Sequence, residues 1–261
     1  MKLFRSLALD LACLGFSFSH ATNRPAQHIM TDSLEIRLAT LDDLPEITDI
    51  VIKAFETDPE WNYRYPRRHD FPEDHFNCTK EPFRQTLESG GGKEDAAHVM
   101  FVVTAKARDS AKRGKPIAVA VWEHQPLNGT QPEIDTRFRT DSRCAKRRDM
   151  NQAHSAEFNR VIFGAKKERF DDKYGTTQMH LEIIATHPDF QGQGAGSNLM
   201  DWGLKTASHE NRVITLLASP GAAGFYTHLG FDILFNLTIQ VQGEAEKVEA
   251  TGMELKKPQD S

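Results

Sequence analysis

The segment HPDFQGQGAGSNLMDW, residues 187–202, places three alternating glycines directly before a helix-like stretch. Such a loop can bind an anion, because the first amides of a helix lack partners and the helix dipole is positive there. Glycine also lets a ligand approach the main chain closely. The spacing is neither that of a P-loop nor the GxGxxG of a dinucleotide-binding fold. A plain tight turn is the alternative interpretation.

Two titratable residues lie on the predicted strand that precedes this loop. In MHLEIIAT, which begins at Met179, His180 and Glu182 alternate onto one face. A histidine or a carboxylate at these positions could relay a proton through water. The alternative is that both side chains only line the exposed face of the strand.

The elements around the loop predict a mixed α/β (α+β) fold. Apolar and alternating runs predict strands in the segments that begin at residues 33, 98, 115, 179, 212, 231 and 251. Helices are expected after Thr40 and within 151–170, 197–208 and 221–231. This order predicts a mostly antiparallel central sheet with helices on both faces. We expect EWNYRYPRRHDFPEDHF, which begins at Glu60, to be a loop with a short helix.

The N-terminal residues imitate a secretory signal. Lys2 and Arg5 precede a mostly apolar run, which Asp10 interrupts. Because the sequence from Met30 reads as structured, we expect residues 1–29 to be a leader, either signal-like or disordered. Residues 30–261 are then a single domain, with a helical insertion at about 126–178.

The composition fits a soluble globular protein. The 261 residues are 39% hydrophobic and 26% charged, with a net charge of −5. No basic footprint for nucleic acid and no run long enough to span a membrane is present in the sequence. Three cysteines, odd in number and without a CxxC motif, predict neither a disulfide nor a metal site. We therefore expect a reducing, cytoplasmic compartment.

Two segments together resemble the GCN5-related N-acetyltransferase superfamily. QGQGAG, 191–196, matches its Q/R-x-x-G-x-G/A element, and GFYTHLGF, 224–231, resembles its second diagnostic segment. The resemblance covers about residues 34–256, with the insertion unmatched. It implies acetyl-CoA as co-substrate and a sheet that is splayed at the acetyl-CoA site, over 183–186. The cofactor-binding residues that it implies are Ile184, Ala185, Thr186, Gln191, Gly192, Gln193, Gly194, Ala195, Gly196 and Ser197.

The same resemblance implies catalytic roles. Tyr226 takes the position of a tyrosine near the CoA sulfur and would protonate the leaving thiolate; a half-buried aromatic is the alternative. HLEIIATHPDFQGQG is similar to arylalkylamine N-acetyltransferases, which carry two histidines at the positions of His180 and Glu182. The carboxylate at the second position leaves both the identity of the base and an arylalkylamine substrate open.

The aromatic segment that begins at Glu60 lies where the superfamily varies and sets its specificity. Trp61, Tyr63 and Tyr65 are therefore the candidate acceptor-binding residues, with core packing as the alternative. We expect an acetyl-CoA-dependent N-acetyltransferase that acts on a primary amine by direct attack, with a small-molecule amine favoured over a protein or peptide amine. The alternative function is a non-catalytic module that binds or senses acyl-CoA. A monomer or a homodimer is expected, without nucleic-acid or membrane partners.

Overall fold

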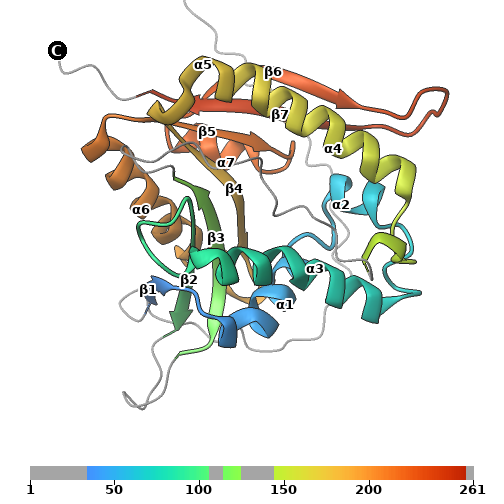
Figure 1. The fold of residues 1–261 in the computed structure, drawn as a ribbon, viewed down its shortest axis with the longest axis horizontal. Helices are drawn as coiled ribbons and strands as arrows, with labels where there is room; N and C mark the ends of the chain where they lie inside the picture. The colour runs from blue at the N-terminus through green and yellow to red at the C-terminus, as the bar shows by residue number, and fades with distance from the viewer. Residues whose placement is uncertain (1–33, 106–113, 125–143, 257–261) are drawn as a thin grey trace, which may run out of the picture.

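The computed structural model describes residues 34–105, 114–124 and 144–256. The expected leader and the first part of the insertion lie outside these ranges. The described chain is built on one seven-stranded sheet in the order β1-β2-β3-β4-β5-β7-β6 (Figure 1). The strands are β1 Leu34–Leu38, β2 His98–Ala105, β3 Pro116–Glu123, β4 Gln178–Thr186, β5 Val213–Ala218, β6 Asp232–Ile239 and β7 Val248–Leu255.

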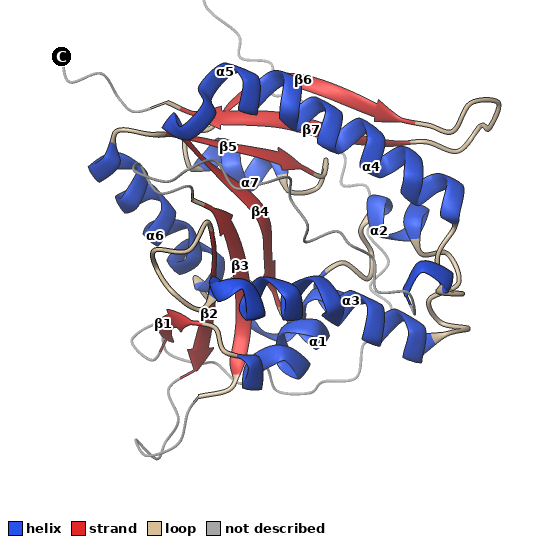
Figure 2. Cartoon of the chain, viewed as in Figure 1, coloured by secondary structure: helices blue, strands red, loops and turns tan. Residues whose placement is uncertain are grey.

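Neighbouring strands are antiparallel with one exception, the parallel pair of β4 and β5. The predicted mixed, mostly antiparallel sheet is therefore confirmed. The helices are α1 Leu44–Ala54, α2 Pro59–Arg64, α3 Pro72–Thr86, α4 Gln152–Lys166, α5 Asp172–Tyr174, α6 Ala195–Glu210 and α7 Ala223–His228 (Figure 2). Short helical turns occupy Leu41–Asp43, Leu87–Gly91, Cys144–Lys146, Lys167–Asp171, Gly175–Thr177 and Pro188–Phe190.

Alternating side chains of the central strands pack into two different cores. On one face, β2, β3 and β4 contribute Val99, Phe101, Ala120, Trp122 and Leu181, which pack together with Leu199 and Met200 of α6 and with Tyr226 of α7. The other face packs against α1 and α3 and includes Met100, Val102, Val119, Val121 and Ala185. Because a strand alternates its side chains between faces, the central residues of β2 (99–103) and β3 (117–122) are apolar and buried on both sides.

The described part of the insertion is helical, as the sequence predicts for 151–170. Helix α4 packs along β6, and its apolar side chains contact the small core that Tyr63 shares with Ile239, Val248 and Ala250. The residues of α4 in this contact are Phe158, Val161 and Ile162. The described part of the insertion therefore packs on the sheet. In the ranges that the structure describes, no helix has the length and apolarity that crossing a bilayer requires.

The expectation of unpaired cysteines is wrong for Cys78 and Cys144. Cys78 of α3 and Cys144 form a disulfide, with 5.5 Å between their Cα atoms. Their sequence separation of 66 residues gives no local motif, so only the packing of α3 against the segment before α4 brings them together. A disulfide is typical of oxidising compartments, so the expectation of a reducing compartment loses its support. Cys13 lies outside the described residues.

Breaking this disulfide should destabilise the fold. Since the bond closes a loop of 66 residues, reduction should lower the free energy of unfolding by about 2–4 kcal/mol. Urea unfolding with and without reductant measures this difference, and non-reducing peptide mapping identifies the linked peptides. A Cys13→Ser variant should keep the Cys78–Cys144 peptide pair. A bond from Cys13 to either of these two cysteines would contradict the assignment.

Candidate active site

Strands β4 and β5 pair over only part of their length. Parallel pairing runs from Gln178 to Leu181, which partners Leu216 of β5. Beyond Leu181, β4 continues to Thr186 beside β3, while β5 continues to Ala218 beside β7. Figure 1 shows the two strands close together at one end and apart at the other. The β5-facing edge of β4 over 182–186 is therefore left without a strand partner among the described residues.

The separation of the strands begins at a bulge. Val121 of β3 partners Ile183 and Trp122 partners Leu181, so Glu182 between them is the extra residue of β4. The side chain of Glu182 is only 22% exposed, although the residue as a whole is exposed. Much of its exposed surface therefore belongs to its main chain, which offers hydrogen-bonding groups at the point where the sheet opens.

The glycine loop 191–196 opens helix α6 without a side-chain cap. Gly192 and Gly194 have φ angles of 72° and 86°, a conformation that favours glycine. Gly194 is the N-cap of α6, so no side chain satisfies the first amides of the helix. The first bond of the helix runs from the Asn198 amide to the Gly194 carbonyl, at 3.0 Å. Unsatisfied amides together with the positive end of the helix dipole form an anion site.

Three elements converge on Gly196. A Cβ atom placed there would lie 3.7 Å from Oγ1 of Thr186, the last residue of β4, and 3.8 Å from the ring of Phe225 in α7. Neither contact is crowded, so the packing of the protein does not itself require glycine at this position. The open edge of β4, the glycine loop and the segment that carries Tyr226 thus form one continuous site.

Tyr226 lies inside the apolar core next to this junction. It is 5% exposed, and its ring centroid lies 5.2 Å from that of Phe225 and 5.7 Å from that of Phe231. Burial raises the pKa of the Tyr226 phenol well above its ordinary value. The phenol is therefore protonated at neutral pH, and its burial makes it a weaker acid than an exposed tyrosine.

His180 is held by a buried polar network. Its side chain is 5% exposed, and Nδ1 lies 2.8 Å from Oγ1 of Thr215 on β5. The Thr215 hydroxyl donates in turn to Oε1 of Gln178, also at 2.8 Å. Because that hydroxyl has a single proton, the bond to His180 places a proton on Nδ1. His180 is thus fixed in its orientation, whereas Glu182 lies at the opening of the sheet.

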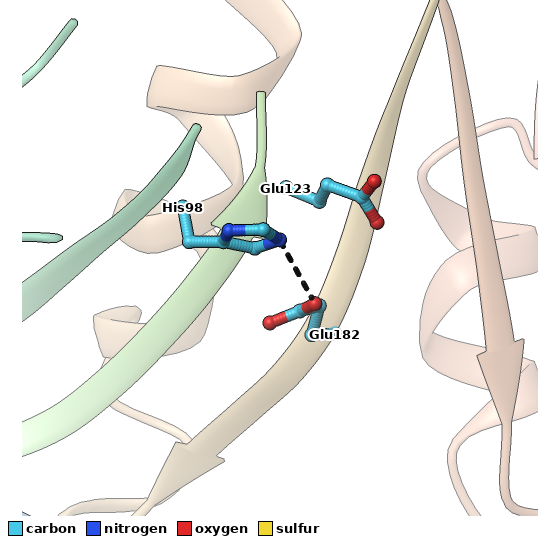
Figure 3. A group of neighbouring side chains, drawn as sticks. All are labelled: His98, Glu123 and Glu182. Atoms are coloured by element: carbon cyan, nitrogen blue, oxygen red, sulfur yellow. Dashed lines mark ion pairs between the residues drawn. The ribbon is translucent and has the colours of Figure 1, made fainter. Parts of the chain in front are cut away.

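Two further residues near this site, His98 and Glu123, are not predicted from the sequence. His98 of β2 is the cross-strand partner of Glu123 on β3, and Glu123 is the partner of His180 on β4. The three residues form a row across the sheet, beside Glu182. Figure 3 shows the side chains of His98 and Glu182 facing each other, with that of Glu123 beside them. His98 and Glu123 are 25 residues apart in the sequence, so only strand register could have revealed this group.

Comparison with known proteins identifies the domain. Residues 152–233 match the family model of the Acetyltransferase (GNAT) domain. This part of the chain is similar to a GNAT acetyltransferase domain. The matched range runs from α4 to the start of β6 and contains β4, the glycine loop and Tyr226. The resemblance drawn from the loop and from GFYTHLGF is confirmed.

Two curated relatives of this chain carry acetyltransferase names. "Uncharacterized N-acetyltransferase ycf52" of Gracilaria tenuistipitata var. liui is 32% identical over 111 residues, which are 42% of this chain and 54% of that protein. The match thus spans about half the length of this relative. "Acetyltransferase" of Stachybotrys chartarum is 21% identical over 223 residues, which are 81% of this chain and 86% of that protein.

A solved structure shares the fold of this chain. It is a protein of Corynebacterium glutamicum described as histone acetyltransferase HPA2 and related acetyltransferase. It superposes with a TM-score of 0.51 at 19% identity, over 88% of this chain and 99% of that one. At this identity the likeness extends to the fold alone.

The predicted acceptor-binding aromatics lie in α2 or directly after it, and each has structural contacts. Tyr63 and Tyr65 are 1% and 6% exposed. Tyr63 stacks on His154 with 3.9 Å between ring centroids, and Tyr65 contacts Trp61 at 4.7 Å. Trp61 is half-buried and donates from Nε1 to Nε2 of His75 at 3.2 Å. Core packing accounts for both tyrosines, and their assignment to the acceptor site stays a prediction, as does that of Trp61.

Proposed function

We propose that the chain is an acetyl-CoA-dependent N-acetyltransferase that moves an acetyl group to a primary amine, with a small-molecule amine favoured. The unpaired edge of β4, which ends at an uncapped glycine loop, is the observation that carries this proposal. In the proposed complex, the main-chain amides of 191–197 bind the diphosphate of coenzyme A. The main chain of Ile184, Ala185 and Thr186 pairs with the pantetheine arm in place of a neighbouring strand.

The reaction in this site is direct attack on the thioester. The amine nitrogen forms a bond to the acetyl carbon while the bond from that carbon to the CoA sulfur breaks. The carbonyl oxygen gains negative charge in the transition state, and main-chain amides at the β4 bulge are suitable donors to it. The attacking nitrogen loses one proton to a base, and the departing thiolate gains one from Tyr226.

Glu182 is the stronger candidate for the base. It lies on the bulge, where the main chain of β4 is exposed, and its carboxylate can accept the proton of the amine. His180 is buried and already donates to Thr215. We therefore assign proton acceptance to Glu182 and a positioning role to His180.

A screen for thiol release tests the proposal. Acetyl-CoA is incubated with the chain and with polyamines, arylalkylamines, aminoglycosides or peptides, and free CoA thiol is measured. Release that depends on one class of small amine supports the proposal, and release with peptides alone moves the acceptor to the protein class. Binding of acetyl-CoA without thiol release from any amine would replace the enzyme by a binding module.

Two glycines of α6 provide a matched test of the coenzyme site. A Cβ atom at Gly203 would lie 2.4 Å from the ring of Trp122, whereas Gly196 has ordinary space. Gly203→Ala should therefore destabilise the fold by about 1–3 kcal/mol through overpacking and leave coenzyme A affinity unchanged. Gly196→Val should fold normally but lose about tenfold or more in affinity, because a branched side chain keeps the ligand from the amides.

Calorimetric titration of coenzyme A and thermal unfolding of both variants separate the two effects. Loss of affinity in Gly203→Ala at a temperature where it is folded, or unchanged affinity in Gly196→Val, would count against the proposed position of the diphosphate.

A further inference from the structure

Three side chains with metal-ligand chemistry meet beside the opening of the sheet. His98, Glu123 and Glu182 each bring one ligand atom, and these atoms all lie within 4.8 Å of one another (Figure 3). They come from three adjacent strands, β2, β3 and β4. Because strands of a sheet are held by their ladders, the three ligands are positioned before any ion arrives.

A lysine of α4 contacts this group. Lys166 pairs with Oε2 of Glu123 at 2.9 Å and with Asp171 at 2.8 Å. The Lys166 ammonium thus pairs with the carboxylates of Glu123 and Asp171. The carboxylate of Glu182 lies beside His98. The side chains of Glu123 and Glu182 are only 15% and 22% exposed.

The kind of ligand selects the kind of ion. Imidazole together with carboxylates suits zinc and neighbouring transition metals, whereas magnesium and calcium prefer oxygen ligands alone. Nε2 of His98 lies 3.6 Å from Oε1 of Glu182. Two ligands of a tetrahedral zinc ion lie about 3.4 Å apart, given metal–ligand distances of about 2.1 Å. This pair is therefore close to ligand spacing without rearrangement.

We propose that His98, Glu123 and Glu182 form a binding site for a transition-metal dication of the zinc type. Three protein ligands leave a fourth position for water. Glu123 keeps its contact with Lys166 through one oxygen and offers its other oxygen to the ion. The sequence predicts no metal site, because these ligands are scattered along the chain and share no motif.

The site overlaps the chemistry proposed for Glu182, and this consequence rests on the proposed function. A carboxylate that binds zinc does not accept a proton from the amine. Zinc is therefore an inhibitor of acetyl transfer that competes with the amine acceptor. Metal binding itself does not depend on this step.

Calorimetric titration of zinc chloride into the full chain, without coenzyme or amine, tests the site. The measurement uses a Cys13→Ser background without reductant, so that this cysteine contributes no thiolate. One ion should bind per chain, and His98→Ala and Glu123→Gln should each weaken binding about tenfold or more. His69→Ala is the matched control, since His69 faces Glu56 at 3.1 Å and belongs to no three-ligand group among the described residues.

Circular dichroism first verifies that each variant is folded. The site is refuted if the parent chain gives no saturable heat, or if His98→Ala binds zinc as well as His69→Ala does. A chain that binds zinc through His98 but never releases thiol from acetyl-CoA keeps the metal site and loses the proposed function. Thiol release by a chain that does not bind zinc would support the proposed function and refute the metal site.

Discussion

Tyr226→Phe should lower the rate of acetyl transfer roughly 100-fold, which is the size of effect expected when a general acid is removed. The hydroxyl group is the only part of the side chain that the substitution removes. The ring of a phenylalanine keeps the contacts with Phe225 and Phe231 that place this residue in the core. Steady-state kinetics with the amine found by the screen give the rate, and calorimetry gives acetyl-CoA affinity, which should change little.

A second tyrosine supplies the control for this substitution. Tyr174 donates its hydroxyl to Glu254 of β7 and lies outside the proposed site. Tyr174→Phe removes a phenol of the same chemistry, and transfer should continue at the parent rate. Equal rates in Tyr226→Phe and the parent chain would leave Tyr226 as a core aromatic, and the thiolate would need another proton donor.

The sequence predicts the elements of the site well where local pattern decides the structure. The positive φ angles of Gly192 and Gly194 confirm that the loop requires glycine for its conformation. Helix α6 places Met200 and Ala207 against the sheet, with Gly203 next to Trp122, which is the close approach that small residues at helical spacing predict. The glycine loop, α6 and the strands beside them are determined by residues that are close in the sequence. Their secondary structure can therefore be predicted from one sequence.

Features that depend on strand register are not predictable in the same way. The bulge at Glu182 shows only in the change of pairing with β3, and the row from His98 to His180 needs the alignment of three strands. Helix α3 extends from Pro72 to Thr86, where the sequence suggests a loop with a short helix. Prolines and polar residues weaken its pattern, and its stability comes from packing on α1 and the sheet.

A buried charge network ties α3 to the segment that precedes α4. The Asp149 carboxylate is fully buried and accepts a bond from Nε of Arg147 at 2.7 Å. It also accepts from Nδ1 of His75 in α3 at 2.7 Å. Trp61 donates to the other nitrogen of the same imidazole. This network therefore fixes one of the predicted acceptor-binding aromatics through a charge that the sequence does not reveal.

The ionised state of Asp149 is held by its partners. Burial opposes ionisation, but the hydrogen bonds from Arg147 and His75 outweigh burial and hold the pKa of this carboxyl below its ordinary value of 3.8. Because the pKa of Asp149 is lower in the folded chain than in the unfolded chain, the ionised carboxylate stabilises the fold above pH 3.8. This stabilisation is lost as the pH falls through the pKa that Asp149 has in the folded chain. Acid unfolding should therefore include the protonation of Asp149.

Asp149→Asn should destabilise the fold by about 3–5 kcal/mol, the cost of leaving a buried charge without its partner. The side chain of Arg147 is 7% exposed and would keep its charge, while an amide in place of the carboxylate offers one oxygen to donors that now use two. Urea unfolding at pH 7 measures the loss. The same series at low pH should show a smaller difference, because the parent chain then loses the contribution of the carboxylate as well.

Asp74→Asn is the matched control, because Asp74 pairs with Arg148 in the same region but at the surface. Its arginine is 60% exposed and remains solvated when the partner is removed, so the free energy of unfolding should change little. Equal losses in the two variants would mean that burial does not decide the strength of these pairs. A large loss confined to Asp149→Asn would show that this buried carboxylate stabilises the packing of α3 against the segment before α4, and would explain how His75 of α3 holds Trp61.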